Sequence, residues 1–179
     1  MDIEFTPLGV TQQELDQLLK FGLKYDKRQK KQMLAAANAP LPTAEDVRGF
    51  ETKLGVVLPD DYKTFLLQKN GGIPKKAKIK IDLLGVKVVQ QFYALTSPAN
   101  SYTLSYLLEV YSERIPNYML PIADDPAGNL YLCRLQPGDA YGNIYFWDHE
   151  EEADGKSQPY FDNITLVADS FTNFLSKLK

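Results

Sequence analysis

The chain has 179 residues, of which 44% are hydrophobic, and 23 acidic against 20 basic side chains give a net charge of −3. This size and composition suit one globular domain and exclude a disordered chain. The slight acidic excess argues against a dedicated nucleic-acid binder and against attraction to anionic membranes. One histidine (His149) and one cysteine (Cys133) cannot form a zinc finger, an iron–sulfur cluster or a disulfide framework.

The chain shows no segment that would direct it into or through a membrane. Its first residues lack the apolar stretch of a signal peptide, and no apolar run approaches the roughly 20 residues that span a bilayer. A single cysteine also fits a reducing compartment. We therefore expect a cytoplasmic protein that has no membrane partner.

Helix signals dominate the first third of the chain. Thr11 and Glu14 form a capping-box pattern ahead of leucines spaced as on one helix face. A second helix, largely exposed, is expected at 26–37 because this stretch is rich in Lys, Gln and Ala. A proline-containing linker follows. We therefore expect residues 1–42 to form a helical extension packed on a domain that spans residues 43–179.

Two further helices are expected at the start of that domain. Thr43 can cap the first of them, and Gly55 can end it. The second helix would be capped by Asp60 or Asp61. It would end at Asn70-Gly71-Gly72, where left-handed backbone is needed.

Strand patterns follow these helices. Apolar residues alternate with polar ones from Ile79 to Leu83, and a second strand is expected at 87–95. Asn100 or Ser101 would cap one more helix. Short strands are then expected at 120–123, 129–135, 143–147 and 165–168, ahead of a last helix that contains Phe171 and Phe174. This order favours an α+β fold with a twisted, largely antiparallel sheet, flanked by N-terminal and C-terminal helices.

Two groups of acids could carry chemistry. The first is Asp148-His149-Glu150-Glu151-Glu152, where carboxylates beside a histidine could bind a metal or transfer protons. Consecutive residues of one loop rarely converge on a metal, so a solvated loop is the simpler interpretation. The second group is Asp124 and Asp125, which either form a metal pair or cap the turn that begins at Pro126.

Sequence signatures of catalysis are missing. The chain has no phosphate-binding glycine loop and no G-x-S-x-G element. Cys133 lies in an alternating strand pattern with no neighbouring base, so a place in the core is expected. Trp147 is the aromatic residue that best marks a semi-exposed binding surface, although a core position is the simpler interpretation. We therefore expect no catalytic residues, no metal site and no cofactor.

Four segments, in order along the chain, resemble blocks of the SUKH superfamily, which includes bacterial toxin-immunity proteins and a fungal cell-wall-synthesis regulator. The first is LGVVLPDDYKTFLLQKNGG (Leu54–Gly72), with its Leu-Pro, acidic residue, Tyr and terminal Asn-Gly-Gly. The others are Pro121-Ile122-Ala123 with Gly128-Asn129, GNIYFWDHE (Gly142–Glu150) and VADSFTNFLSKL (Val167–Leu178). The resemblance covers roughly residues 43–179, and the Lys75–Ser101 region departs from it.

This resemblance implies a twisted antiparallel sheet with flanking helices and a non-enzymatic role. The protein would bind and neutralise a cognate polymorphic or contact-dependent toxin, often a nuclease. The active site of a nuclease is basic, so carboxylates on an inhibitor would speed association and give specificity. The expected partner-binding residues are Asp124, Asp125, Asp148, Glu150, Glu151 and Glu152, with Trp147 as an apolar anchor.

Two other functions stay open at this stage. One is a regulatory or scaffold domain that binds a host protein, as the fungal relatives do. The other is a metal-dependent phosphodiesterase that would use Asp124, Asp125, His149 and Glu150. The oligomeric state is not indicated by the sequence.

Overall fold

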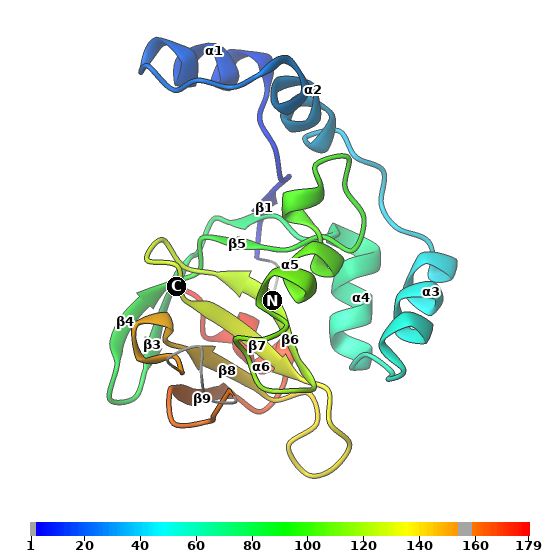
Figure 1. The fold of residues 1–179 in the computed structure, drawn as a ribbon, viewed down its shortest axis with the longest axis vertical. Coiled ribbons are helices and arrows are strands. Elements are labelled where there is room, and N and C mark those ends of the chain that lie inside the picture. Colours follow the sequence, from blue (N-terminus) through cyan, green and yellow to red (C-terminus); the bar gives the residue numbers. More distant parts are fainter. Residues whose placement is uncertain (1–2, 154–158) are drawn as a thin grey trace.

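The computed structural model describes residues 3–153 and 159–179 and has the α+β architecture that the sequence predicts (Figure 1). Its helical elements are α1 (Gln12–Lys20), α2 (Lys27–Ala36), α3 (Ala44–Leu54), α4 (Asp60–Lys69), η1 (Asn100–Tyr102), α5 (Leu104–Tyr111), η2 (His149–Glu151) and α6 (Phe171–Ser176), where η marks a 3-10 turn. Its strands are β1 (Phe5–Thr6), β2 (Ile73–Pro74), β3 (Lys78–Ile81), β4 (Gly85–Val88), β5 (Gln91–Phe92), β6 (Met119–Asp124), β7 (Leu130–Arg134), β8 (Ile144–Trp147) and β9 (Ile164–Ala168).

The main sheet has the strand order β5-β6-β7-β8-β9, and each neighbouring pair is antiparallel. Side chains alternate along each strand, so its two faces carry different aromatic clusters. On one face, the ring of Tyr131 contacts those of Phe146 and of Phe174 in α6. On the other face, Trp147 contacts Tyr111 of α5. Helices α5 and α6 therefore cover opposite faces of the sheet (Figure 1).

The first three helices begin where the sequence predicts. Thr11, Asp26 and Thr43 each cap a helix through a complete capping box. Gly55 ends α3 in left-handed backbone with a φ of 71°. Local hydrogen bonding at these ends is enough to define them, because the bonds join residues only three positions apart.

The start of α4 differs from the prediction. Pro59 occupies the cap position and makes no side-chain bond, so neither Asp60 nor Asp61 is the cap. The Asp61 carboxylate instead accepts hydrogen bonds from the backbone N–H (2.8 Å) and the hydroxyl (3.1 Å) of Thr172. Asp61 thus joins the start of α4 to the first turn of α6, a contact between residues far apart in sequence.

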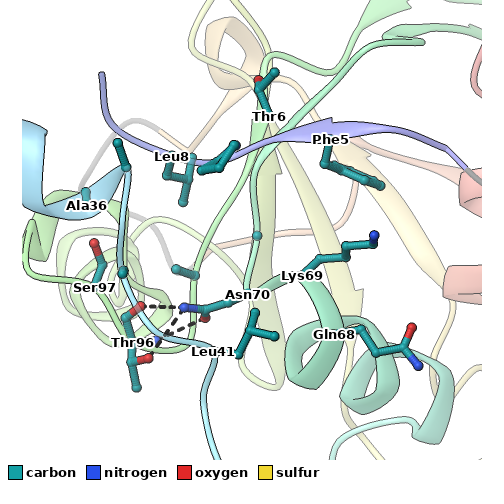
Figure 2. Close-up of a pocket in the computed structure, with 15 residues that line it drawn as sticks. Phe5, Thr6, Leu8, Ala36, Leu41, Gln68, Lys69, Asn70, Thr96 and Ser97 are labelled. Atoms are coloured by element: carbon teal, nitrogen blue, oxygen red, sulfur yellow. Dashed lines mark hydrogen bonds between the residues drawn. The ribbon is translucent and has the colours of Figure 1, made fainter. Parts of the chain in front are cut away.

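The Asn70-Gly71-Gly72 segment after α4 begins with an asparagine that connects two parts of the fold. Asn70 has left-handed backbone with a φ of 53°. Its side-chain oxygen accepts a hydrogen bond from the backbone N–H of Leu95 (2.9 Å). Its amide donates to the carbonyl of Thr96 (2.7 Å) (Figure 2). These bonds fix the chain after β5 against the end of α4.

The two glycines of this segment permit close backbone contacts. At Gly71, where φ is 83°, a Cβ atom would lie 2.6 Å from the carbonyl oxygen of Phe92. At Gly72 it would lie 2.8 Å from the carbonyl oxygen of Thr6 in β1. Real side chains do not tolerate such distances, so only glycine lets β1, α4 and β5 meet here.

The region from Lys75 to Ser101 departs most from the prediction. The expected strand at 87–95 is divided, because β4 pairs with β3 in a separate hairpin whereas β5 joins β6. Leu83, expected to continue the alternation of Ile79 and Ile81, lies fully exposed at the turn of this hairpin with a φ of 69°. The apolar alternation does not show where a hairpin turns, so sequence reading missed it.

The helix that precedes β6 begins later than predicted. Asn100 and Ser101 lie in η1, and Thr103 is the residue that caps α5. The Thr103 hydroxyl accepts a hydrogen bond from the backbone N–H of Tyr106 (3.3 Å) and donates one to the carbonyl of Asn100 (2.8 Å). One threonine therefore ends η1 and starts α5.

Helices α1 and α2 form a hairpin (residues 11–38, the α1–α2 hairpin) that projects from the rest of the molecule (Figure 1). Leu15 and Ala36 are buried there, outside the main core cluster. Gly9, with a φ of 92°, lies so close to α2 that a Cβ atom would be 2.4 Å from the carbonyl oxygen of Met33. The hairpin thus has a small core of its own and one close backbone contact.

Candidate partner-binding site

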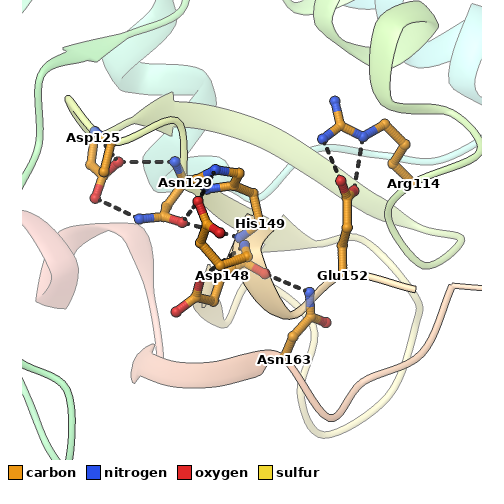
Figure 3. A network of polar contacts seen from close by, with 9 residues as sticks. Arg114, Asp125, Asn129, Asp148, His149, Glu152 and Asn163 are labelled. Carbon is orange, nitrogen blue, oxygen red and sulfur yellow. Dashed lines mark hydrogen bonds and ion pairs between the residues drawn. The ribbon is translucent and has the colours of Figure 1, made fainter. Parts of the chain in front are cut away.

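The predicted acids lie around the point where the β6–β7 turn, η2 and the start of β9 meet (Figure 3). Asp125 is at the turn and is only 6% exposed. Its carboxylate accepts hydrogen bonds from the backbone N–H of Ala127 (2.9 Å) and from the backbone and side-chain N–H groups of Asn129 (both 2.9 Å). These bonds hold the Asp-Pro-Ala-Gly-Asn turn closed. Asp125 is therefore a turn residue whose side chain is not presented to a partner.

Asn129 links this turn to η2. Its side-chain oxygen lies 3.0 Å from the backbone nitrogen of His149 and 2.9 Å from Nδ1 of that ring. Because the ionised Asp125 carboxylate can only accept, the Asn129 amide nitrogen must face it and the oxygen must face His149. Nδ1 of the imidazole therefore carries a hydrogen, which it donates to Asn129. The other ring nitrogen, Nε2, lies 3.0 Å from Oε1 of Glu150.

Asp148 joins η2 to the start of β9. Its carboxylate accepts a hydrogen bond from the backbone N–H of Glu150 (3.1 Å), which starts the 3-10 turn. Its backbone pairs with Asn163, both through the Asp148 N–H (3.0 Å) and through the Asn163 side-chain amide (2.8 Å) (Figure 3). The polypeptide on both sides of η2 is thus fixed in place by buried amides.

Glu152 is held by Arg114, which lies in the turn that follows α5. The guanidinium of Arg114 donates two hydrogen bonds to its carboxylate, from Nε (2.9 Å) and Nη2 (2.8 Å) (Figure 3). The same guanidinium lies over the rings of Tyr111 (4.8 Å) and Trp147 (5.5 Å). Bidentate pairing and cation–π contact together orient the arginine, so Glu152 serves to anchor η2 to the scaffold.

Trp147 is not semi-exposed. Its side chain is 1% exposed and meets Tyr111 edge-on at 5.9 Å. Alternation along β8 directs it to the sheet face that α5 covers. The expectation that it forms an apolar anchor on the surface is therefore wrong.

Asp124 is also directed inward. Its Oδ2 atom accepts hydrogen bonds from Tyr93 (2.9 Å) and from the side chain of Gln91 (3.0 Å), whereas Oδ1 is buried without a partner. Burial raises the pKa of this carboxyl above its ordinary value, and the two hydrogen bonds partly oppose that rise. Asp124 thus links β5 to β6 and offers little surface to a partner.

Two of the predicted acids that remain open to solvent, Asp148 and Glu151, border a cavity of about 270 Å³. Glu150 and Glu151 are exposed and Asp148 is partly so. The cavity is lined by Leu84, Asp148, Glu151, Tyr160, Asp162, Asn163 and Thr165. Sequence reading missed Asp162 because it lies outside the acidic run, although it directly precedes Asn163, whose amide ties the start of β9 to η2.

The residues of the proposed phosphodiesterase do not form a metal site. Across residues 3–153 and 159–179, no three His, Cys, Asp or Glu side chains are grouped so that they could hold a metal ion. Asp125 and His149 both contact Asn129, and Asp124 faces β5. Burial also raises the pKa of the Cys133 thiol, which disfavours its nucleophilic form.

No helix in the described part of the chain is long and apolar enough to cross a membrane.

Two comparisons with known proteins place the chain. A relative from Bacillus subtilis (strain 168), described as SPbeta prophage-derived uncharacterized protein YokK, is 29% identical over 175 residues, covering 87% of this chain and 84% of the relative. A family model described as SMI1 / KNR4 family (SUKH-1) matches residues 41–177, which include the sheet, η2 and the cavity. Because this match spans far more than half of the sequence, the chain belongs to the SMI1 / KNR4 family (SUKH-1).

Proposed function

We propose that the protein is a non-enzymatic immunity protein, which binds a cognate polymorphic or contact-dependent toxin and blocks its action in the cytoplasm. Membership of the SUKH-1 family supports a protein partner. The prophage origin of the Bacillus relative fits a gene carried by a mobile element. A regulatory or scaffold domain that binds a host protein is the alternative.

The observation that carries the proposal is that some of the acids are bonded within the fold, whereas others face solvent. Asp125 and Glu152 are used within the fold, through the turn and through Arg114. Glu150 and Glu151 point to solvent from a segment that these same contacts hold rigid. Rigid presentation lowers the entropy lost on binding, and exposed carboxylates suit a basic surface such as the phosphate-binding site of a nuclease.

The experiment is co-expression with the toxin encoded next to this gene. We expect restored growth of cells that make the toxin, and a stable complex of the two proteins on gel filtration. Glu151→Lys should weaken the complex about tenfold or more, because it reverses an exposed charge that would face the basic surface of the toxin. Glu45→Lys is the matched control, because Glu45 is exposed on α3 and pairs only with the exposed Arg48.

Three outcomes would contradict the proposal. The first is growth that is not restored, and the second is equal loss of binding in both variants. The third is capture of a housekeeping protein in cells that lack such a toxin, which would favour the scaffold alternative.

A further inference from the structure

The α1–α2 hairpin carries a charge opposite to that of the rest of the chain. Residues 11–38 contain six basic and three acidic side chains, a net charge of +3, and the remainder carries −6. Among the residues that the structure describes, none of the six basic side chains lies within ion-pair distance of an acid. The hairpin therefore presents positive charge that the fold itself does not use.

The tip of this hairpin, residues 20–24, also exposes apolar surface. Phe21 is 84% exposed and Leu23 is 47% exposed, and Lys20 and Lys24 flank them. An aromatic ring that faces water costs free energy, so such a projecting residue commonly marks an interaction site. The tip combines two apolar anchors with two cations.

The cavity beside η2 has the complementary chemistry. Three of its lining side chains are carboxylates, those of Asp148, Glu151 and Asp162, and none of the lining residues that the structure describes is basic. The charge of this cavity is thus opposite to that of the hairpin tip.

We propose that the hairpin tip of one copy of this chain docks on the acidic cavity of a second copy, and that the protein forms a two-fold symmetric dimer. Figure 1 shows the hairpin at one end of the long axis, whereas η2 and β9 lie in the other half of the molecule. Two copies side by side in opposite directions bring each tip to the cavity of its partner. The contact forms twice, as an isologous pair requires.

The contact is small, so the dimer is weak and depends on salt. Each tip contributes few residues, and exposed ion pairs are screened by added salt. We expect association at protein concentrations of about 10 μM to 1 mM, decreasing as sodium chloride rises. A toxin bound at the same carboxylates would displace the second copy. The following experiment contains no toxin, so it tests the self-contact independently of the proposed function.

The test is sedimentation of the full chain with exchanged charges. The tip variant carries Lys20→Glu and Lys24→Glu, and the cavity variant carries Glu151→Lys and Asp162→Lys. Each variant alone should associate at least about tenfold more weakly than the wild type, because like charges meet at both contacts. An equal mixture should associate again, since each tip then meets a cavity of opposite charge.

A control distinguishes the specific contact between tip and cavity from general attraction between molecules of opposite net charge. Lys53→Glu with Lys76→Glu makes the same change in net charge at exposed sites outside the tip, and this variant should not pair with the cavity variant. Phe21→Ser tests the apolar anchor; its side chain is almost fully exposed, so the fold does not depend on it.

Several results would overturn the proposal. One is a monomer at every concentration and salt level, and another is association that the tip variants leave unchanged. Pairing of the control with the cavity variant would also contradict it. Binding of the wild type to vesicles of anionic phospholipid, lost in Phe21→Ser while the protein in solution stays monomeric, would assign the tip to a lipid surface instead.

Discussion

The main domain and the α1–α2 hairpin are stabilised differently. The main domain encloses an extended aromatic core and a polar network in which Asp125 and Asn129 bind several partners at once. The hairpin buries few residues, among them Leu15 and Ala36, and its cations form no ion pair with any residue that the structure describes. The main domain is therefore held together by many internal contacts, whereas most residues of the hairpin are exposed to solvent.

Gly71→Ala should give the largest loss of stability in the main domain, about 3 kcal/mol or more in the free energy of unfolding. The backbone has positive φ there, and the new Cβ would lie 2.6 Å from the carbonyl oxygen of Phe92. Urea denaturation measures this. Gly49→Ala is the matched control, because Gly49 is in helix α3 with open space around it, and alanine should stabilise it slightly. Equal midpoints for the two variants would contradict the prediction.

Asp125→Ala should lower the free energy of unfolding by about 2 kcal/mol, because three buried or part-buried donors lose their acceptor. The free Asn129 amide should then release His149, so the NMR signals of η2 should move together with those of the β6–β7 turn. Glu151→Ala, at an exposed carboxylate of the same region, should change stability by less than about 0.5 kcal/mol. If both variants were equally stable, the turn would not depend on Asp125.

Asp124→Asn should have a smaller effect, which is confined to the dependence of stability on pH. Burial raises the pKa of Asp124 above its ordinary value of 3.8, so the folded state binds this proton more tightly than the unfolded state. Stability therefore falls as pH rises from 3.8 through the raised pKa, and the asparagine variant should lack this decrease. Thermal denaturation between about pH 4 and pH 7 measures the difference. Parallel curves for both proteins would exclude the effect.

Gly9→Ala should have the smallest effect on global unfolding, below about 0.5 kcal/mol. The local strain is of the same kind as in Gly71→Ala, because φ is 92° and the new Cβ would lie 2.4 Å from the Met33 carbonyl oxygen. The difference is that the strain falls on the hairpin, which opens without the main core. Hydrogen exchange should become faster in α1 and α2 only. A global loss comparable to that of Gly71→Ala would show that the two regions unfold as one.

Features set by neighbouring residues were predictable from the sequence. Thr11 and Thr43 cap helices through partners three residues away, and Gly55 ends α3 as its type predicts. The order of helices and strands gave the α+β class, and the ordered sequence blocks indicated the SUKH family before any coordinates. The domain boundary proposed at residue 43 stays a prediction.

Features set by distant partners were not predictable. The sequence leaves Trp147 open between a surface anchor and the core, and Asp125 between a partner-binding acid and a turn residue. Contact with α5 decides for the core, and the hydrogen bonds with Asn129 decide for the turn. Alternation shows that a strand has two faces, but it does not show which face a helix will cover. Asp162 was missed for the same reason, because its place beside Leu84 depends on how the β3–β4 hairpin lies against the β8–β9 segment.

Both stems of the α1–α2 hairpin return to one corner of the molecule. Leu8 from the incoming stem and Leu41 from the outgoing stem line the same cavity of about 190 Å³ beside Asn70 (Figure 2). The helices between them are thus an insertion whose ends close on the domain without crossing its core. A segment attached in this way can be lengthened, shortened or exchanged with little disturbance of the sheet.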